Sequence, residues 1–193
     1  MRDHVCPQCW WTGDPQQDPW IWRELIARSG QVAYGKFFNN KAGFISRKWF
    51  PVFANYRRDG YDFDALYDDE LASKRSKKIM DLFEDHDELY SFEIKKMAGF
   101  GKDGEKNFDG VITQLQMQAY LVIRDFRQRT RKKDGTAYGW PIAVYTTPEH
   151  LWGYKEIEAA YKEDPEVSRE RIFARISEEY PWAQREVMER VLR

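Results

Sequence analysis

The stretch MQAYLVIRDFRQRTRKKDGTAYGWPIAVYT, residues 117–146, contains two runs typical of β-strands with a turn between them. In the first run every second side chain from Met117 to Ile123 is apolar, which is the period of two expected of a strand. Lys133-Asp134-Gly135 is a turn signal, and residues 138–146 are rich in β-branched and aromatic side chains. The sequence therefore predicts a β-hairpin with a basic tip.

Helical patterns precede this hairpin. The predicted helices are Leu66–Phe83, Leu89–Met97 and Phe108–Leu115. Asp62 or Asp64 can open the first of them as an N-cap. Because a helix followed by a hairpin with a basic tip is typical of a winged helix, residues 61–147 are predicted to form a winged-helix module with a β-hairpin wing.

Residues 20–60 are predicted to form a helix-turn-helix module of three short helices joined by tight turns. The helices cover Ile21–Ser29, Val32–Asn39 and Arg47–Tyr56. Gly30 ends the first helix, and Ser46 can cap the third. The turn between the second and third helices is Asn40-Lys41-Ala42-Gly43.

The two ends of the chain differ in character. Residues 1–19 show no periodic pattern and predict an irregular arm, whereas residues 148–193 are predicted to be helical in pieces broken at Asp164-Pro165 and Tyr180-Pro181. The predicted fold class is therefore mainly α with a small β part (α+β). Its architecture is two winged-helix-like modules in tandem, with a basic β-hairpin wing and a C-terminal helical segment. Residues 21–193 are expected to form one compact unit.

Composition excludes several classes of protein. Of the 193 residues, 42% are hydrophobic and 16% aromatic, too many for a disordered chain. No apolar run approaches the roughly 18 residues of a membrane span, and the first residues lack the apolar segment of a secretory signal. Two Cys cannot form a disulfide framework, so a reducing, cytoplasmic location is expected. The net charge of −1 excludes a uniformly basic surface, so any nucleic-acid contact must be local.

The strongest local charge lies at residues 124–133, with six basic residues and one acidic residue. If the strand continues, Arg127, Arg129 and Arg131 project from one face and can follow a row of phosphates. The predicted phosphate contacts of this segment are Arg124, Arg127, Arg129, Arg131, Lys132 and Lys133. The alternative is a solvated hairpin whose bases pair with the acidic tail, since residues 149–193 carry eleven acids against eight bases.

Four lysines lie shortly before the hairpin. They are Lys95, Lys96, Lys102 and Lys106. In a winged helix the helix before the wing is presented to the groove of DNA, so these lysines are expected to share a surface with the arginines.

No metal or cofactor is expected. Cys6 and Cys9 have CxxC spacing, but no second pair exists and the three His are not at ligand spacing. The glycine-rich stretch at residues 99–104 lacks the ending of a P-loop. No Ser or Cys lies in a nucleophile elbow beside a His.

The segment Gln114-Leu115-Gln116-Met117-Gln118 is rich in amides. In a strand, Gln116 and Gln118 point to the same side and can hold a water by donating to it and accepting from it. Amides are poor bases, so they suit a reaction such as loss of a positively charged, N-alkylated base from deoxyribose. The alternative is a polar strand whose amides bond to backbone or face solvent.

The stretch GVITQLQMQAY, residues 110–120, resembles the helix-to-strand signature of AlkZ-type bacterial DNA glycosylases. That winged-helix family has a catalytic Gln-Φ-Gln motif, where Φ is apolar, preceded by a Leu. The matching residues are Leu115, Gln116, Met117 and Gln118; a second register would use Gln114 and Gln116. The stretches at residues 32–57 and 138–153 are similar to a shorter group of AlkZ-related bacterial proteins. The resemblance implies metal-independent excision of alkylated purines, with Gln116 and Gln118 positioning the hydrolytic water.

Three functions are therefore carried forward. The first is a DNA glycosylase-like hydrolase of DNA repair, in which Tyr120 or Tyr138 supports an extruded nucleotide. The second is a winged-helix DNA-binding protein without catalysis, whose glutamines are structural. The third is a soluble interaction protein whose basic wing contacts an acidic partner. DNA is the expected partner of the first two, with no membrane involved.

Overall fold

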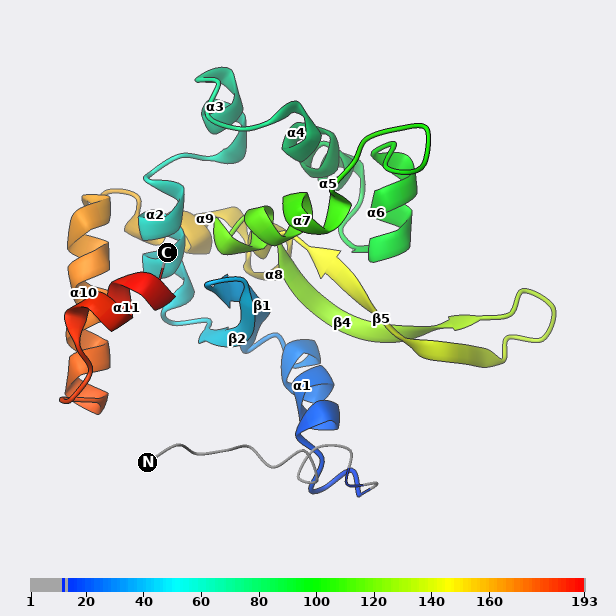
Figure 1. The fold of residues 1–193 in the computed structure, drawn as a ribbon, viewed down its shortest axis with the longest axis horizontal. Helices are drawn as coiled ribbons and strands as arrows, with labels where there is room; N and C mark the ends of the chain where they lie inside the picture. Colours follow the sequence, from blue (N-terminus) through cyan, green and yellow to red (C-terminus); the bar gives the residue numbers. More distant parts are fainter. Residues whose placement is uncertain (1–11, 13, 193) are drawn as a thin grey trace.

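A five-stranded antiparallel sheet organises the part of the chain that the computed structural model describes, which is residue 12 and residues 14–192 (Figure 1). The strands are β1 (Val32–Phe38), β2 (Lys41–Ser46), β3 (Leu89–Tyr90), β4 (Val122–Thr130) and β5 (Ala137–Thr146), in the order β2-β1-β4-β5-β3. Tyr34 of β1 lies opposite Ile123 of β4. This pairing joins residues 20–60 and residues 61–147 in one sheet.

Helices surround this sheet and confirm the predicted α+β class. Before β4 they are α1 (Pro19–Arg28), α2 (Phe50–Arg58), α3 (Phe63–Asp68), α4 (Lys74–Met80), α5 (Leu82–Asp85), α6 (Ser91–Met97) and α7 (Phe108–Met117). After β5 they are α8 (Pro148–Trp152), α9 (Tyr154–Ile157), the 3-10 helix η2 (Glu158–Ala160), α10 (Pro165–Glu179) and α11 (Arg185–Val191). None of the helices in the described residues has the length and apolar character needed to cross a bilayer.

The helix predicted over Val32–Asn39 is wrong, because these residues form β1. Asn39 and Asn40 both have positive φ, at 50° and 62°. They make a two-residue hairpin turn of the primed type, which suits the twist of paired strands and tolerates Asn. Residues 20–60 therefore contain a helix, a hairpin and a second helix in place of three helices.

Other helix boundaries also move. Ser46 ends β2 and does not cap a helix; the N-cap of α2 is Trp49, without a side-chain hydrogen bond. The region predicted as one helix over Leu66–Phe83 divides into α3, α4 and α5. Asp62 does cap α3, accepting a 2.8 Å hydrogen bond from the Ala65 N–H. The predicted helix over Leu89–Met97 begins with the short strand β3.

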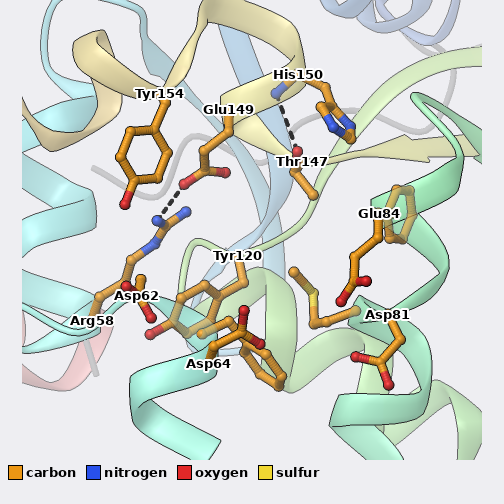
Figure 2. Close-up of a pocket in the computed structure, with 13 residues that line it drawn as sticks. Arg58, Asp62, Asp64, Asp81, Glu84, Tyr120, Thr147, Glu149, His150 and Tyr154 are labelled. Atoms are coloured by element: carbon orange, nitrogen blue, oxygen red, sulfur yellow. Dashed lines mark hydrogen bonds and ion pairs between the residues drawn. The ribbon is translucent and has the colours of Figure 1, made fainter.

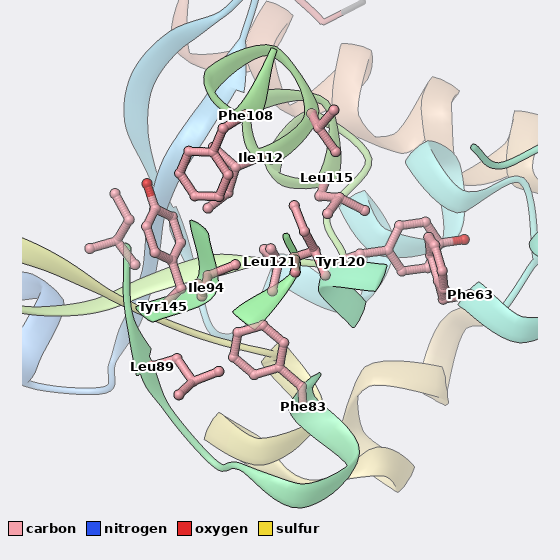
Figure 3. Close-up of a cluster of buried hydrophobic side chains, with 14 of the residues drawn as sticks. Phe63, Phe83, Leu89, Ile94, Phe108, Ile112, Leu115, Tyr120, Leu121 and Tyr145 are labelled. Atoms are coloured by element: carbon pink, nitrogen blue, oxygen red, sulfur yellow. The ribbon is translucent and has the colours of Figure 1, made fainter. Parts of the chain in front are cut away.

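The largest buried cluster lies around α7 (Figure 3). Phe108, Ile112 and Leu115, spaced by four and three residues, form one apolar face of that helix. Figure 3 shows this face directed toward Tyr145 of β5 and Leu121. The packing fixes α7 against the sheet. A separate cluster packs α10 and α11 on α2.

Candidate nucleic-acid interface

The outer part of the β4–β5 hairpin projects away from the rest of the molecule (Figure 1). Every residue from 128 to 140 is exposed. The predicted hairpin is confirmed, with Thr130 opposite Ala137 and a turn that includes Lys133-Asp134-Gly135. We call residues 128–140 the wing. A projecting ribbon of this kind can reach a partner that the body of the protein does not touch.

The wing carries four cations that have no carboxylate partner within 4.0 Å in the described part of the chain. They are Arg129, Arg131, Lys132 and Lys133. The alternative pairing with the acidic tail is not seen, since no ion pair among residues 12 and 14–192 joins residues 124–133 to residues 149–192. Charged groups that are exposed and unpaired remain available to phosphates.

Arg124 and Arg127 are engaged within the protein. Arg124 donates a 2.7 Å hydrogen bond to the carbonyl of Arg28, at the end of α1. Arg127 pairs with Glu88 and, at 2.7 Å, with Asp125. The hydrogen bonds to Glu88 and Asp125 raise the pKa of Arg127 above its ordinary value despite partial burial.

The predicted row of arginines is interrupted. Arg127 lies opposite Ile142 and Arg129 lies opposite Tyr138, so one residue of β4 between these pairs faces three of β5. Gly139, with φ of 74°, lies in this irregularity. Arg127 therefore belongs to the base of the hairpin, and the unpaired cations begin beyond it.

The four lysines before the hairpin lie on and after α6. Lys95, Lys96 and Lys102 are exposed. The ammonium of Lys106 instead closes its own loop, donating to the carbonyls of Gly101, at 2.8 Å, and Lys102. All four lysines are thus exposed, but the ammonium of Lys106 is engaged within its own loop.

Helix α6 is connected to the wing through an aromatic contact. The guanidinium carbon of Arg129 lies 4.3 Å from the ring centroid of Phe92, in the first turn of α6. Phe92 was not predicted as a binding residue, because an aromatic residue near the start of a helix is a weak indication of a site. The contact places the exposed face of α6 next to the unpaired cations.

The two predicted stacking tyrosines have different surroundings. Tyr138 lies on β5 in the wing and is 42% exposed. Tyr120 is buried: its hydroxyl donates to the Tyr61 carbonyl at 3.0 Å, and Arg58 covers its ring at 4.4 Å. Trp140 was not selected from the sequence, although it is 79% exposed on β5. A Trp beside a Pro in a hairpin was the signal available.

The strand predicted through the glutamine motif is wrong. Gln116 lies in α7, and Gln118 is the C-cap of that helix. With 3.6 residues per turn, side chains two apart point to nearly opposite sides of a helix, whereas in a strand they would share a side. Gln116 and Gln118 therefore do not converge on one water.

Gln116 is 0% exposed and fastens α7 to β1. Its Nε2 donates to the Ile112 carbonyl at 3.0 Å, and its Oε1 accepts from the Lys36 N–H at 3.0 Å. Lys36 also reaches back to α7, where its ammonium donates to the Thr113 hydroxyl at 3.3 Å. Both polar atoms of the Gln116 amide thus have protein partners.

Gln114 and Gln118 are the pair that shares the outer face of α7, since they are four residues apart. Together with Asn40 and Arg57 they line a groove of about 320 Å³. Arg57 donates to the Phe37 carbonyl at 2.8 Å, while its Nε is buried and has no partner among the described residues. Burial lowers the pKa of Arg57. The groove therefore offers two solvent-facing amides beside a poorly satisfied cation.

A second cavity, of about 340 Å³, is acidic (Figure 2). Its carboxylates are Asp62, Asp64, Asp81, Glu84 and Glu149. Figure 2 shows Arg58 bonded to Glu149, at 2.5 Å, on one wall of the cavity. Burial opposes the charge of Arg58, but Glu149 and Tyr161 hold the pKa of this guanidinium above its ordinary value. An excess of carboxylates repels phosphate, so this cavity does not suit an anionic ligand.

No group of three or more His, Cys, Asp or Glu side chains in the described ranges is placed to hold a metal ion. Cys6 and Cys9 lie outside the described residues.

The sequence model of a family described as AlkZ related matches residues 1–193. Among proteins with curated descriptions, none matches the chain.

Proposed function

Because the chain belongs to the AlkZ-related family, we propose that it is a DNA-binding protein that contacts the duplex with its wing and with the exposed face of α6. The observation that carries this proposal is the set of unpaired cations, Arg129, Arg131, Lys132 and Lys133, on a projecting hairpin. Because the overall charge is −1, DNA binding requires a local basic surface. These four residues, together with Lys95 and Lys96, supply it in this proposal. In this proposal the wing and its neighbouring helices act as a winged-helix module.

Hydrolytic release of an alkylated purine is the activity that the family relation suggests. The oxygen of a water would form a bond to C1′ of deoxyribose while the C1′–N bond breaks. The electron pair of the broken bond would stay on the base and neutralise its positive charge, and a proton of the water would pass to solvent. Gln114 and Gln118 are the two amides proposed to hold that water, because both line the outer groove of α7. Gln116 is proposed to act by positioning α7 against β1, since its amide is occupied.

A second candidate is DNA binding without catalysis. Burial of Gln116 is the observation that favours it, because one member of the Gln-Φ-Gln motif has no access to a substrate in this structure. The two candidates share the wing and differ only at α7.

The test is binding and base release measured on the same duplex at low salt, with and without a single N7-methylguanine. Wild-type protein is expected to bind both duplexes. Catalysis would be supported if wild-type protein releases the methylated base and Gln118→Ala does not. Gln31→Ala is the matched control and should still release the base, because Gln31 is an exposed glutamine between α1 and β1. Binding without release would favour the second candidate. Absence of binding to either duplex would overturn the proposal.

A further inference from the structure

A recess of about 320 Å³ lies where the wing meets the body of the protein. It is lined by Tyr90, Phe92, Arg129, Thr130 and Tyr138. Its volume is at the lower end of the range found for small-molecule sites. Three aromatic rings and one guanidinium thus line a space separate from the outer groove of α7, and of the proposed phosphate contacts only Arg129 reaches it.

The recess is built on regular secondary structure. Arg129 and Tyr138 lie directly opposite each other on β4 and β5, so their side chains are cross-strand neighbours. Tyr90 belongs to β3, which pairs with β5 at Val144. Phe92 lies in the first turn of α6, and its ring centroid lies 5.2 Å from that of Tyr90, with the ring planes at 30°. Side chains held by three strands and a helix favour a preformed site.

The rings in this recess remain accessible. Phe92 is 37% exposed and Tyr138 is 42% exposed. Arg129 covers Phe92 but has no carboxylate partner in the part of the chain that is described. A cationic ligand would be repelled by this guanidinium, whereas a flat, neutral ring can stack on the aromatics and on the guanidinium plane.

We propose that this recess binds one unpaired nucleobase of DNA, stacked against Tyr138 and the guanidinium plane of Arg129, which the ring of Phe92 supports from its other side. The inference rests on the proposed DNA binding and specifies the form of DNA preferred. Arg131 and Lys132 follow the end of β4 at the tip of the wing and would hold phosphates of the same strand. A duplex with a bulged or extruded nucleotide is therefore the preferred ligand, and a fully paired duplex is the weaker one.

The experiment compares two 20-base-pair duplexes that differ by one bulged 2-aminopurine. Wild-type protein is expected to bind the bulged duplex more tightly and to quench its 2-aminopurine fluorescence. Phe92→Ala and Tyr138→Ala should each weaken bulged-duplex binding roughly 5- to 150-fold and abolish the quenching, with little effect on the paired duplex. Tyr138→Phe keeps the ring and is the matched control, expected to behave as wild type.

Failure of this inference and failure of the proposed DNA binding give different results. If wild-type protein binds both duplexes equally, with no change in fluorescence, the recess does not hold a base although the wing still binds DNA. If wild-type protein binds neither duplex at low salt, the proposed function fails and this inference fails with it. Thermal unfolding of each variant separates a loss of stacking from a loss of fold.

Discussion

Replacing Arg131, Lys132 and Lys133 together by Gln is expected to flatten the salt dependence of DNA binding. All three side chains are exposed, and in the described part of the protein none has a carboxylate partner, so each is free to displace a counterion from DNA. Each phosphate contact contributes a slope of about −0.9 to a plot of log K against log salt. Loss of three contacts should therefore reduce the steepness by about 2.7.

The consequence for affinity is large enough to measure. Between about 50 and about 200 mM salt, a slope difference of about 2.7 corresponds to roughly 40-fold in affinity. The wild-type protein should lose that much more affinity than the variant across this range. Fluorescence anisotropy of a labelled duplex at four or five salt concentrations gives the slope directly.

A charge-matched control is available among the exposed cations that follow β5. Lys155, Lys162 and Arg190 are exposed, and no ion pair is seen for them within residues 14–192. Their triple replacement by Gln changes the net charge equally but should leave the slope close to that of wild type. An unchanged slope in the wing variant, or an equal reduction in this control, would refute the assignment of phosphate contacts to the wing.

Three further predictions concern stability. Gln116→Ala should lower the free energy of unfolding by about 1–3 kcal/mol, because the partly buried Lys36 N–H loses its acceptor; urea denaturation measures this, and a neutral result would contradict the role given to Gln116. Arg58→Met should cost roughly 3 kcal/mol by leaving Glu149 without its buried partner, and an unchanged melting temperature would count against it. Burial raises the pKa of Asp125, but hydrogen bonds from two arginines outweigh it and hold that pKa below its ordinary value of 3.8. The resulting stabilisation is complete above that value and lost as pH falls toward the folded-state pKa, so Asp125→Asn should be less stable than wild type near neutral pH and approach it in acid; a constant difference across acid denaturation curves would argue otherwise.

The sequence predicted those features that depend on local chemistry. The β4–β5 hairpin was predicted because alternating side chains and a Lys-Asp-Gly turn are local signals, and Asp62 was one of two residues predicted as a helix cap, with Asp64, for the same reason. The end of α7 was missed because Ala119 takes the left-handed conformation, with φ of 62°, at a position where Gly is the usual signal. The glutamines were consequently assigned to a strand.

The availability of each cation could not be predicted locally. Arg127 is neutralised by Glu88, 39 residues earlier, and Arg124 bonds to a carbonyl 96 residues away. Such partners are known only once the chain is folded. The segment at residues 124–133 was therefore correctly recognised as basic, while the division between its engaged and unpaired members required the structure.

The exposure of the wing has a consequence for hydrogen exchange. Because residues 128–140 are exposed throughout, the amide hydrogens of this segment lack the protection that a packed face gives, and they are expected to exchange with deuterium by local opening long before those of α7. A bound polyanion that orders the hairpin would slow exchange in this segment while leaving the buried helices unchanged. Hydrogen exchange in the wing can therefore show whether a ligand binds to this segment.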